Sequence, residues 1–223
     1  MRKNVDLNEI SDGRKYRSAD MVKAGCHDCK DCSSCCQEMG ESILLEPYDI
    51  YMLQGNLHVG FETLLKREAA LGMEDGVILP HIRMDDKERC PFLDENERCS
   101  IHAFRPGLCR LFPLGRVYEE DGFYYILQVH ECPKPNKTKV KIQKWMGVPS
   151  FGEYETYVLK WHNLIKYLQE DAKEIGEELL RTRNLYFLNL FYVYPFHTGE
   201  DFYPQFYARM KEFISKTGIS FPV

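Results

Sequence analysis

Five of the nine cysteines in this 223-residue chain lie within eleven residues, from Cys26 to Cys36. Cys26, Cys29, Cys32 and Cys35 follow one another with two residues between each, and Cys36 follows Cys35 directly. Two intervening residues let a tight loop turn both sulfurs to the same side of the backbone, where they can bind one metal ion or one corner of a cluster. One such pair would be weak evidence, but a run of this length predicts that the segment folds around a metal centre.

The other four cysteines are spread over residues 90–132. Cys90 and Cys132 each precede a proline, and Cys109 follows Pro-Gly-Leu, so these three thiols belong to turns that can place side chains around an ion. His27 and His102 lie among the cysteines and are secondary candidates. The residues that we expect to bind metal are all nine cysteines: Cys26, Cys29, Cys32, Cys35, Cys36, Cys90, Cys99, Cys109 and Cys132.

The spacing of the first group favours an iron–sulfur cluster. Through Cys26, Cys29, Cys32 and Cys36 the intervals are two, two and three residues, which is the bacterial ferredoxin run of [4Fe–4S] proteins, although Gln37 stands where proline normally follows. Structural zinc without catalytic activity stays open as an alternative, because four-thiolate zinc sites are also built from pairs spaced by two residues. A third alternative is a set of buried thiols with one redox disulfide.

Charge and composition exclude several classes of function. The 29 basic and 34 acidic residues give a formal net charge of −5, so there is no overall basic field to hold nucleic acid or an anionic membrane. The longest apolar stretch, residues 185–196, is shorter than the ~20 residues that span a bilayer. The amino terminus lacks an apolar signal segment, so we expect a cytoplasmic protein, in which clustered cysteines bind metal more often than they form disulfides. The partners that remain are a protein substrate and a redox partner.

The hydrophobic pattern predicts an α+β fold, with short strands and a β-hairpin in a cysteine-rich metal-cluster core and a helical C-terminal layer. We expect strands at residues 42–46 and 77–83, and a hairpin formed by residues 112–118 and 123–130. We expect helices at residues 47–53, 60–71, about 137–146, 153–181 and 202–214.

These elements suggest a division of the chain into three parts. Residues 1–25 would form an N-terminal arm, residues 26–133 the cysteine-cluster metal-binding domain, and residues 134–223 a helical region packed on it. The last part contains no cysteine. With 44% hydrophobic residues the chain has enough apolar surface to build one sizeable core beneath the cysteines.

Further motifs accompany the run Cys29-x2-Cys32-x2-Cys35-Cys36. They are Ile43-Leu-Leu-Glu-Pro-Tyr-Asp49, Cys90-Pro-Phe-Leu93, Cys99-Ser-Ile-His102 and Arg105-Pro-Gly-Leu-Cys109-Arg110-Leu-Phe-Pro113. Together they resemble the CxxCxxCC cysteine-cluster family, which is credited with chelating zinc or iron. The resemblance covers about half of the chain and leaves the C-terminal third unmatched.

The resemblance implies that the eight cysteines from Cys29 to Cys132 hold a metal or a cluster. One branch of the family, similar to flagellin lysine-N-methylases, is credited with methyl transfer to protein lysines, so S-adenosylmethionine enters as a cofactor by resemblance only. The chain differs from many relatives at His102, at Ser33 and in the additional Cys26. It has no Gly-x-Gly loop for a nucleotide cofactor. An enzyme with an open coordination position and a non-catalytic protein with a closed centre both stay open.

Two arginines flank Cys109 and are candidate cofactor-binding residues. Arg105 and Arg110 could hold a carboxylate or phosphate beside the centre, because a guanidinium presents a fixed pair of donors. The alternative is a structural role, in which they pair with acidic residues of the preceding loop, Asp94, Glu95 or Glu97.

Overall fold

The computed structural model describes residues 6–26 and 32–222, and it is an α+β protein, as expected. The α-helices of the described chain are α1 (Leu7–Ile10), α2 (Pro47–Leu57), α3 (Phe61–Arg67), α4 (Gly107–Leu111), α5 (Ile142–Met146), α6 (Phe151–Asp171), α7 (Glu177–Leu188) and α8 (Phe202–Thr217). The 3₁₀ turns η1 (Ser34–Cys36) and η2 (His102–Phe104) and the π-helical segment η3 (Asn189–Val193) complete the helical elements described. The strands are β1 (Met21–Gly25), β2 (Ala69–Glu74), β3 (Val77–Ile82), β4 (Leu114–Glu119), β5 (Gly122–Leu127) and β6 (Thr138–Lys141).

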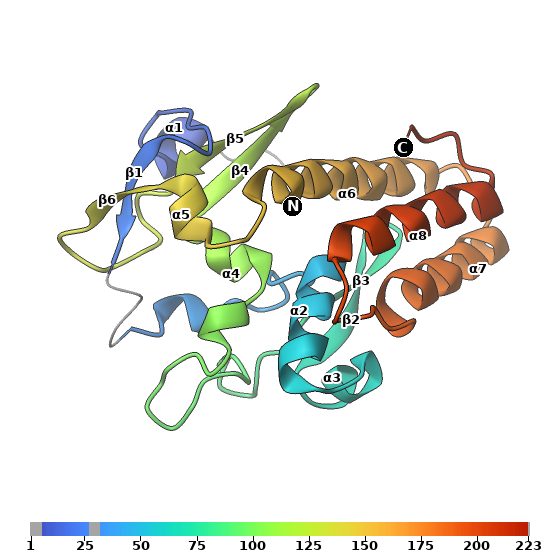
Figure 1. Ribbon diagram of the computed structural model, residues 1–223, viewed down its shortest axis with the longest axis horizontal. Helices are drawn as coiled ribbons and strands as arrows, with labels where there is room; N and C mark the ends of the chain where they lie inside the picture. Colours follow the sequence, from blue (N-terminus) through green and yellow to red (C-terminus); the bar gives the residue numbers. More distant parts are fainter. Residues whose placement is uncertain (1–5, 27–31, 223) are drawn as a thin grey trace.

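The strands form three separate antiparallel pairs, β1 with β6, β2 with β3, and β4 with β5. Figure 1 shows α6, α7 and α8 gathered on one side with α2, α3 and the β2–β3 pair, while the β1–β6 and β4–β5 pairs lie on the other side with α1. The short helix α4 and the loops that carry the cysteines lie between and below these two groups. The site therefore borders both parts of the molecule.

Aromatic side chains build the helical core. The ring of Tyr157 on α6 meets the ring of Phe206 on α8 edge-on, with centroids 4.7 Å apart. Trp161, one turn further along α6, stacks on Phe187 of α7 at 5.5 Å. Such ring pairs contribute about 0.5–1.5 kcal/mol each beyond the area they bury. The predicted apolar stripe on α6 is confirmed as the seam of this layer.

The prediction of a single helix over residues 153–181 is wrong for the second half of that range. The structure ends α6 at Asp171 and starts α7 at Glu177, after Gly176 in an extended conformation. The buried Arg183 of α7 donates to the carbonyl oxygen of Leu168 and contacts the Asp171 carboxylate, so the chain reverses and pairs the two helices. The helix expected at residues 202–214 is confirmed as α8.

The helix expected at residues 60–71 is also too long. It stops at Arg67, and the following residues form β2, which pairs with the correctly expected β3. Asp75 and Gly76 connect the two strands with φ values of 47° and 87°, the left-handed conformation that a tight hairpin turn requires. The strand expected at residues 42–46 is reduced to one bridge between Leu44 and His81.

Near the amino terminus, β1 pairs with β6, which is more than one hundred residues later in the chain. The helix expected at about residues 137–146 begins instead as this strand and turns helical only at Ile142. A Cβ on Gly25 would lie 2.3 Å from the Thr138 hydroxyl oxygen, so a side chain here would force Thr138 to move where the two strands approach closely. The division into an arm, a cysteine domain and a helical region stays a prediction.

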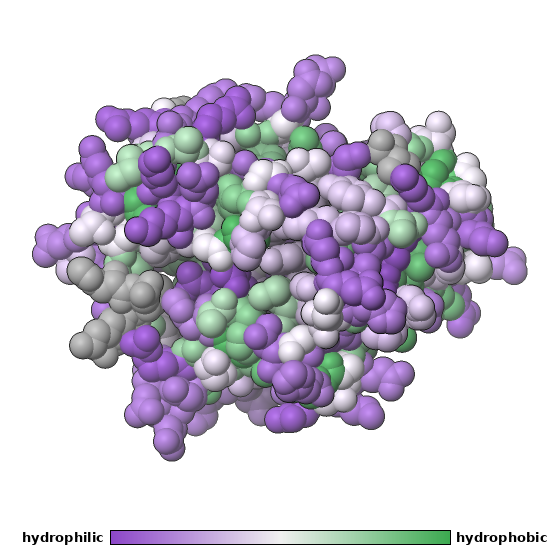
Figure 2. Space-filling view, in the orientation of Figure 1, coloured by the Kyte–Doolittle hydropathy of each residue, from purple (hydrophilic) through white to green (hydrophobic). Residues whose placement is uncertain are grey.

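The hairpin of β4 and β5 is confirmed, with Glu119 paired to Gly122 at its tip. Hydrophilic side chains cover most of the face seen in Figure 2, and hydrophobic areas on it are small and separated. Among the described residues, no helix combines the length and the apolar character that crossing a bilayer demands.

Candidate metal centre

The start of α2 is tied to the helix that carries Cys109. Pro47 opens α2, and the amide of Glu46 donates to Oδ2 of Asp49 at 2.8 Å, closing a capping box. The other carboxylate oxygen of Asp49, Oδ1, accepts from the amide of Gly107 at 2.8 Å. Asp49 is buried, and this burial raises its pKa to about 6. One carboxyl group thus fixes α4 relative to α2.

Gly107 allows this approach because it has no side chain. A Cβ at this position would come within 2.5 Å of the hydroxyl oxygen of Tyr154, which lies fully buried on α6. Real Cβ atoms do not tolerate such a contact, so any other residue would force either the buried Tyr154 ring or α4 with Cys109 to move.

The buried guanidinium of Arg110 donates hydrogen bonds to the loop that precedes α4. Its Nε donates to the carbonyl of Arg105 at 2.9 Å, and its Nη2 donates to the carbonyl of Ala103 at 2.6 Å. Nη1 makes a longer bond of 3.4 Å to the carbonyl of Met146 on α5. Arg110 is 8% exposed, and all three nitrogens are directed at backbone oxygens. It supports the loop that carries Arg105 rather than facing the thiols.

Backbone pairing joins the first cysteine group to the second. The amide of Cys90 donates to the carbonyl of Cys36 at 2.8 Å, and the amide of Glu38 donates to the carbonyl of Glu88 at 2.8 Å. These two bonds run like a short antiparallel pair. They bring together the adjacent cysteines of η1 and the turn at Cys90-Pro91.

The acidic loop between Cys90 and Cys99 is self-contained. Asp94 Oδ1 accepts from the amides of Asn96 and Arg98, both at 2.8 Å, and Leu93 forms a bridge with Cys99. The pairing of Arg105 and Arg110 with Asp94, Glu95 or Glu97, the structural alternative considered above, is absent from the ion pairs within residues 6–26 and 32–222. Asp94 instead shapes the turn that leads to Cys99.

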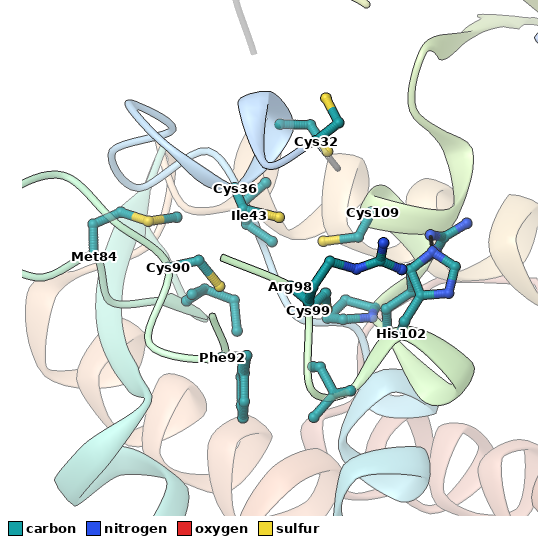
Figure 3. Close-up of a pocket in the computed structure, with 15 residues that line it drawn as sticks. Cys32, Cys36, Ile43, Met84, Cys90, Phe92, Arg98, Cys99, His102 and Cys109 are labelled. Carbon is teal, nitrogen blue, oxygen red and sulfur yellow. Dashed lines mark hydrogen bonds between the residues drawn. The ribbon is translucent and has the colours of Figure 1, made fainter. Parts of the chain in front are cut away.

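These elements form a pocket that we call the main thiol pocket. Its empty volume, including the part that is open to solvent, is about 650 Å³. The sulfurs of Cys36, Cys90 and Cys109 point toward its interior, and Cys32 is set apart from Cys90 (Figure 3). Its cysteines are Cys32, Cys35, Cys36, Cys90, Cys99 and Cys109.

A smaller neighbouring pocket, which we call the side thiol pocket, has about 300 Å³ of space counted in the same way. Its cysteines are Cys26, Cys32, Cys35 and Cys132. Cys32 and Cys35 therefore line both pockets. No disulfide joins any two of the eight cysteines that the structure describes.

The thiols of the main pocket affect one another's protonation. A hydrogen bond from the Cys36 thiol lowers the pKa of Cys35 to about 7, and the same bond raises the pKa of Cys36. Burial raises the pKa of Cys90 to about 11 and also raises the pKa of Cys99 and Cys109. Neutral buried thiols become thiolates when a bound cation replaces their protons. The donor set is therefore suited to a metal or a cluster.

Arg105 faces the thiols. It lines the main thiol pocket and contacts Nε2 of His102 through Nη1. Its positive charge adds to the lowering of the Cys35 pKa and partly opposes the rise that burial causes in the pKa of Cys99. Its Nε is buried without a hydrogen-bond partner among the residues that the structure describes. Arg98 lines the pocket as well, and it was missed in the sequence because a lone arginine in a charged loop carries no signal.

The structure brings together most of the sequence candidates, in two groups. Cys26 and Cys132 are found at the side pocket only, and Arg105 and His102 at the main pocket. Arg110 lines neither pocket. Cys29 and His27 lie outside the described residues. Within the described ranges, no three His, Cys, Asp or Glu side chains already surround a single point closely enough to hold one metal ion.

Comparison with known proteins gives the family. The model of the CxxCxxCC family, described as "Putative zinc- or iron-chelating domain", matches residues 28–140, just over half of the chain. The chain belongs to this family. Family membership supports the binding of a metal, zinc or iron, by the cysteine cluster. The search of curated proteins gave no match, and neither did the search of solved structures.

Proposed function

We propose that the chain binds an iron–sulfur cluster in the main thiol pocket and uses it to exchange electrons with a redox partner. Of the eight described cysteines, four line this pocket only, namely Cys36, Cys90, Cys99 and Cys109. They come from η1, from the loop after β3 and from α4, so the fold supplies a ligand on several sides. Four thiolates are the usual ligand set of a [4Fe–4S] cluster.

The observation that favours a cluster over zinc is the spread of these thiols. Zinc–sulfur bonds of about 2.3 Å place the sulfurs of a tetrahedral site about 3.8 Å apart, around one point. No three candidate side chains in the described parts of the chain have that arrangement. A cluster of several irons binds each thiolate at a different corner, and it therefore suits thiols that are distributed around a pocket.

The number of thiols favours a closed centre. Four protein ligands fill the positions of a four-iron cluster, which leaves no iron free to bind a substrate. Arg98 and Arg105 line the pocket, and no Asp or Glu among the described residues does, so the charge of this described lining suits an anionic assembly of thiolates. A closed cluster of this kind supports electron transfer rather than chemistry at a metal.

Anaerobic purification followed by iron, zinc and sulfide analysis tests the proposal. We expect brown protein with a broad visible absorption band and iron and acid-labile sulfide in near-equal amounts. Cys99→Ser should lower both contents strongly. Met84→Leu changes a lining residue that cannot replace a thiolate, and it should leave both contents unchanged. Colourless protein with tightly bound zinc and no sulfide would refute the cluster and support the structural zinc alternative.

A second candidate function, methyl transfer with S-adenosylmethionine, is favoured by one observation. Within the described part of the chain, the buried Nε of Arg105 has no partner although the side chain lines the main thiol pocket, and a ligand carboxylate would satisfy it. Titration of the metal-loaded protein with S-adenosylmethionine tests this candidate. Saturable binding that Arg105→Lys weakens at least tenfold, with metal content retained, would favour the methyl-transfer function over electron transfer.

A further inference from the structure

We infer that the chain holds a second metal centre in the side thiol pocket, with Cys26, Cys32, Cys35 and Cys132 as its described thiolate ligands. The inference rests on the proposed function, because it assigns the remaining described cysteines to a centre of the same chemistry. It starts from the division of the eight described cysteines between two adjoining pockets.

The positions of the thiols show how the division runs. The sulfurs of Cys36, Cys90 and Cys109 point into the main pocket (Figure 3), and Cys35, which lines both pockets, hydrogen-bonds to Cys36. Cys32, by contrast, has its sulfur 3.6 Å from the hydroxyl oxygen of Ser34, a residue that lines only the side pocket. The wall between the two pockets is formed by Cys32 and Cys35, and Cys32 belongs with the side pocket.

Two described cysteines, Cys26 and Cys132, line only the side pocket, and neighbouring elements position both of them. Cys26 directly follows β1, and it is 6% exposed. Cys132 precedes β6, and its carbonyl accepts a bond of 2.7 Å from Nζ of Lys137. Because β1 pairs with β6, the strand pair brings cysteines from distant parts of the chain to one pocket.

The ferredoxin-like spacing agrees with two centres rather than one. In two-cluster ferredoxins, the fourth cysteine of the x2, x2, x3 run binds the other cluster and not the one held by the cysteines before it. Here the fourth cysteine, Cys36, lines only the main pocket, whereas Cys26 and Cys32 line the side pocket. Of the described members of the run, Cys26 therefore lines the side pocket alone, Cys36 the main pocket alone, and Cys32 both.

Metal and sulfide content of anaerobically prepared protein tests the inference. We expect the wild-type chain to contain twice the iron and sulfide of Cys26→Ser/Cys132→Ser, and Cys36→Ser/Cys99→Ser to retain the other half. Ser34→Ala is the matched control, since it changes a side-pocket residue that is not a thiol and should retain the full content. Because Cys26 is buried, Cys132→Ser alone repeats the test at a partly exposed residue.

The outcomes separate this inference from the proposed function. Wild-type protein without iron and sulfide would refute the proposed cluster itself. Wild-type content that corresponds to one cluster, unchanged in Cys26→Ser/Cys132→Ser, would leave the cluster in the main pocket and overturn the second centre. Complete loss of metal in a folded Cys132→Ser variant would show one centre shared by both pockets, and it would also overturn the inference.

Discussion

Replacing Arg110 by lysine should destabilise the protein, because Arg110 holds three backbone carbonyls from within the fold. Bonds from a charged donor contribute about 1.5–3 kcal/mol each, and a lysine ammonium can replace one of the two short bonds at most. The bond to the Met146 carbonyl is long at 3.4 Å and adds little. We therefore expect a loss of about 3 kcal/mol, which corresponds to a decrease in Tm of roughly 6–12 °C for a chain of this size.

The assay is thermal unfolding of the anaerobic, metal-loaded protein at fixed metal concentration, followed by circular dichroism. Arg105→Lys is the matched control, because Arg105 lies in the same loop and makes no hydrogen bond to a backbone carbonyl among the described contacts. It should change Tm by much less than Arg110→Lys. An Arg110→Lys variant with the Tm of the wild type would refute the structural role that the three bonds assign to Arg110.

Three other predictions concern the packing of α4, the carboxyl group of Glu46 and the removal of metal. Gly107→Ala should lower stability by about 1–3 kcal/mol, because its methyl group forces Tyr154 aside. Gly152→Ala, which has open space around it, should not lower stability, and adding Tyr154→Phe to Gly107→Ala should recover part of the loss. Equal melting temperatures of the two alanine variants would contradict this prediction. Burial raises the pKa of Glu46 from 4.5 to about 7, so the contribution of its protonated form to stability is complete below pH 4.5 and is lost as the pH rises to about 7. Denaturant titrations at several pH values should show this decline in the wild type and not in Glu46→Gln. Parallel curves of unfolding free energy against pH for the two proteins would be evidence against it. Metal removal should increase hydrogen exchange first in residues 32–36 and 90–109 and last in α6 and α8, and uniform loss of protection would show that the helical layer is not independent of the centre.

Local signals account for the parts of the fold that the sequence predicted correctly. The helical spacing of Tyr157 and Trp161 gave α6, and Asp121 with Gly122 gave the β4–β5 turn. The same logic should have found the β2–β3 hairpin from Asp75 and Gly76, but the apolar spacing from Phe61 favoured a longer helix. Here a turn signal outweighed periodicity.

Non-local contacts account for what the sequence could not give. Spacing predicted that the cysteines bind metal as a class, but it could not show that Cys26 and Cys132 share a pocket, because that depends on pairing between β1 and β6. It also placed Asp49 within a motif without showing that its carboxylate binds the amide of Gly107. A pattern of residue types carries no information about which backbone amide a carboxylate reaches.

The pairing of β1 with β6 has a consequence for the order of events during synthesis. At roughly 5–20 residues per second, the ribosome takes about 6–23 s to proceed from Gly25 to Thr138. All cysteines of the main thiol pocket have been made by Cys109, whereas the strand that completes the side thiol pocket is still missing at that point. The nascent chain therefore passes through a stage in which one pocket can close and the other must wait for β6.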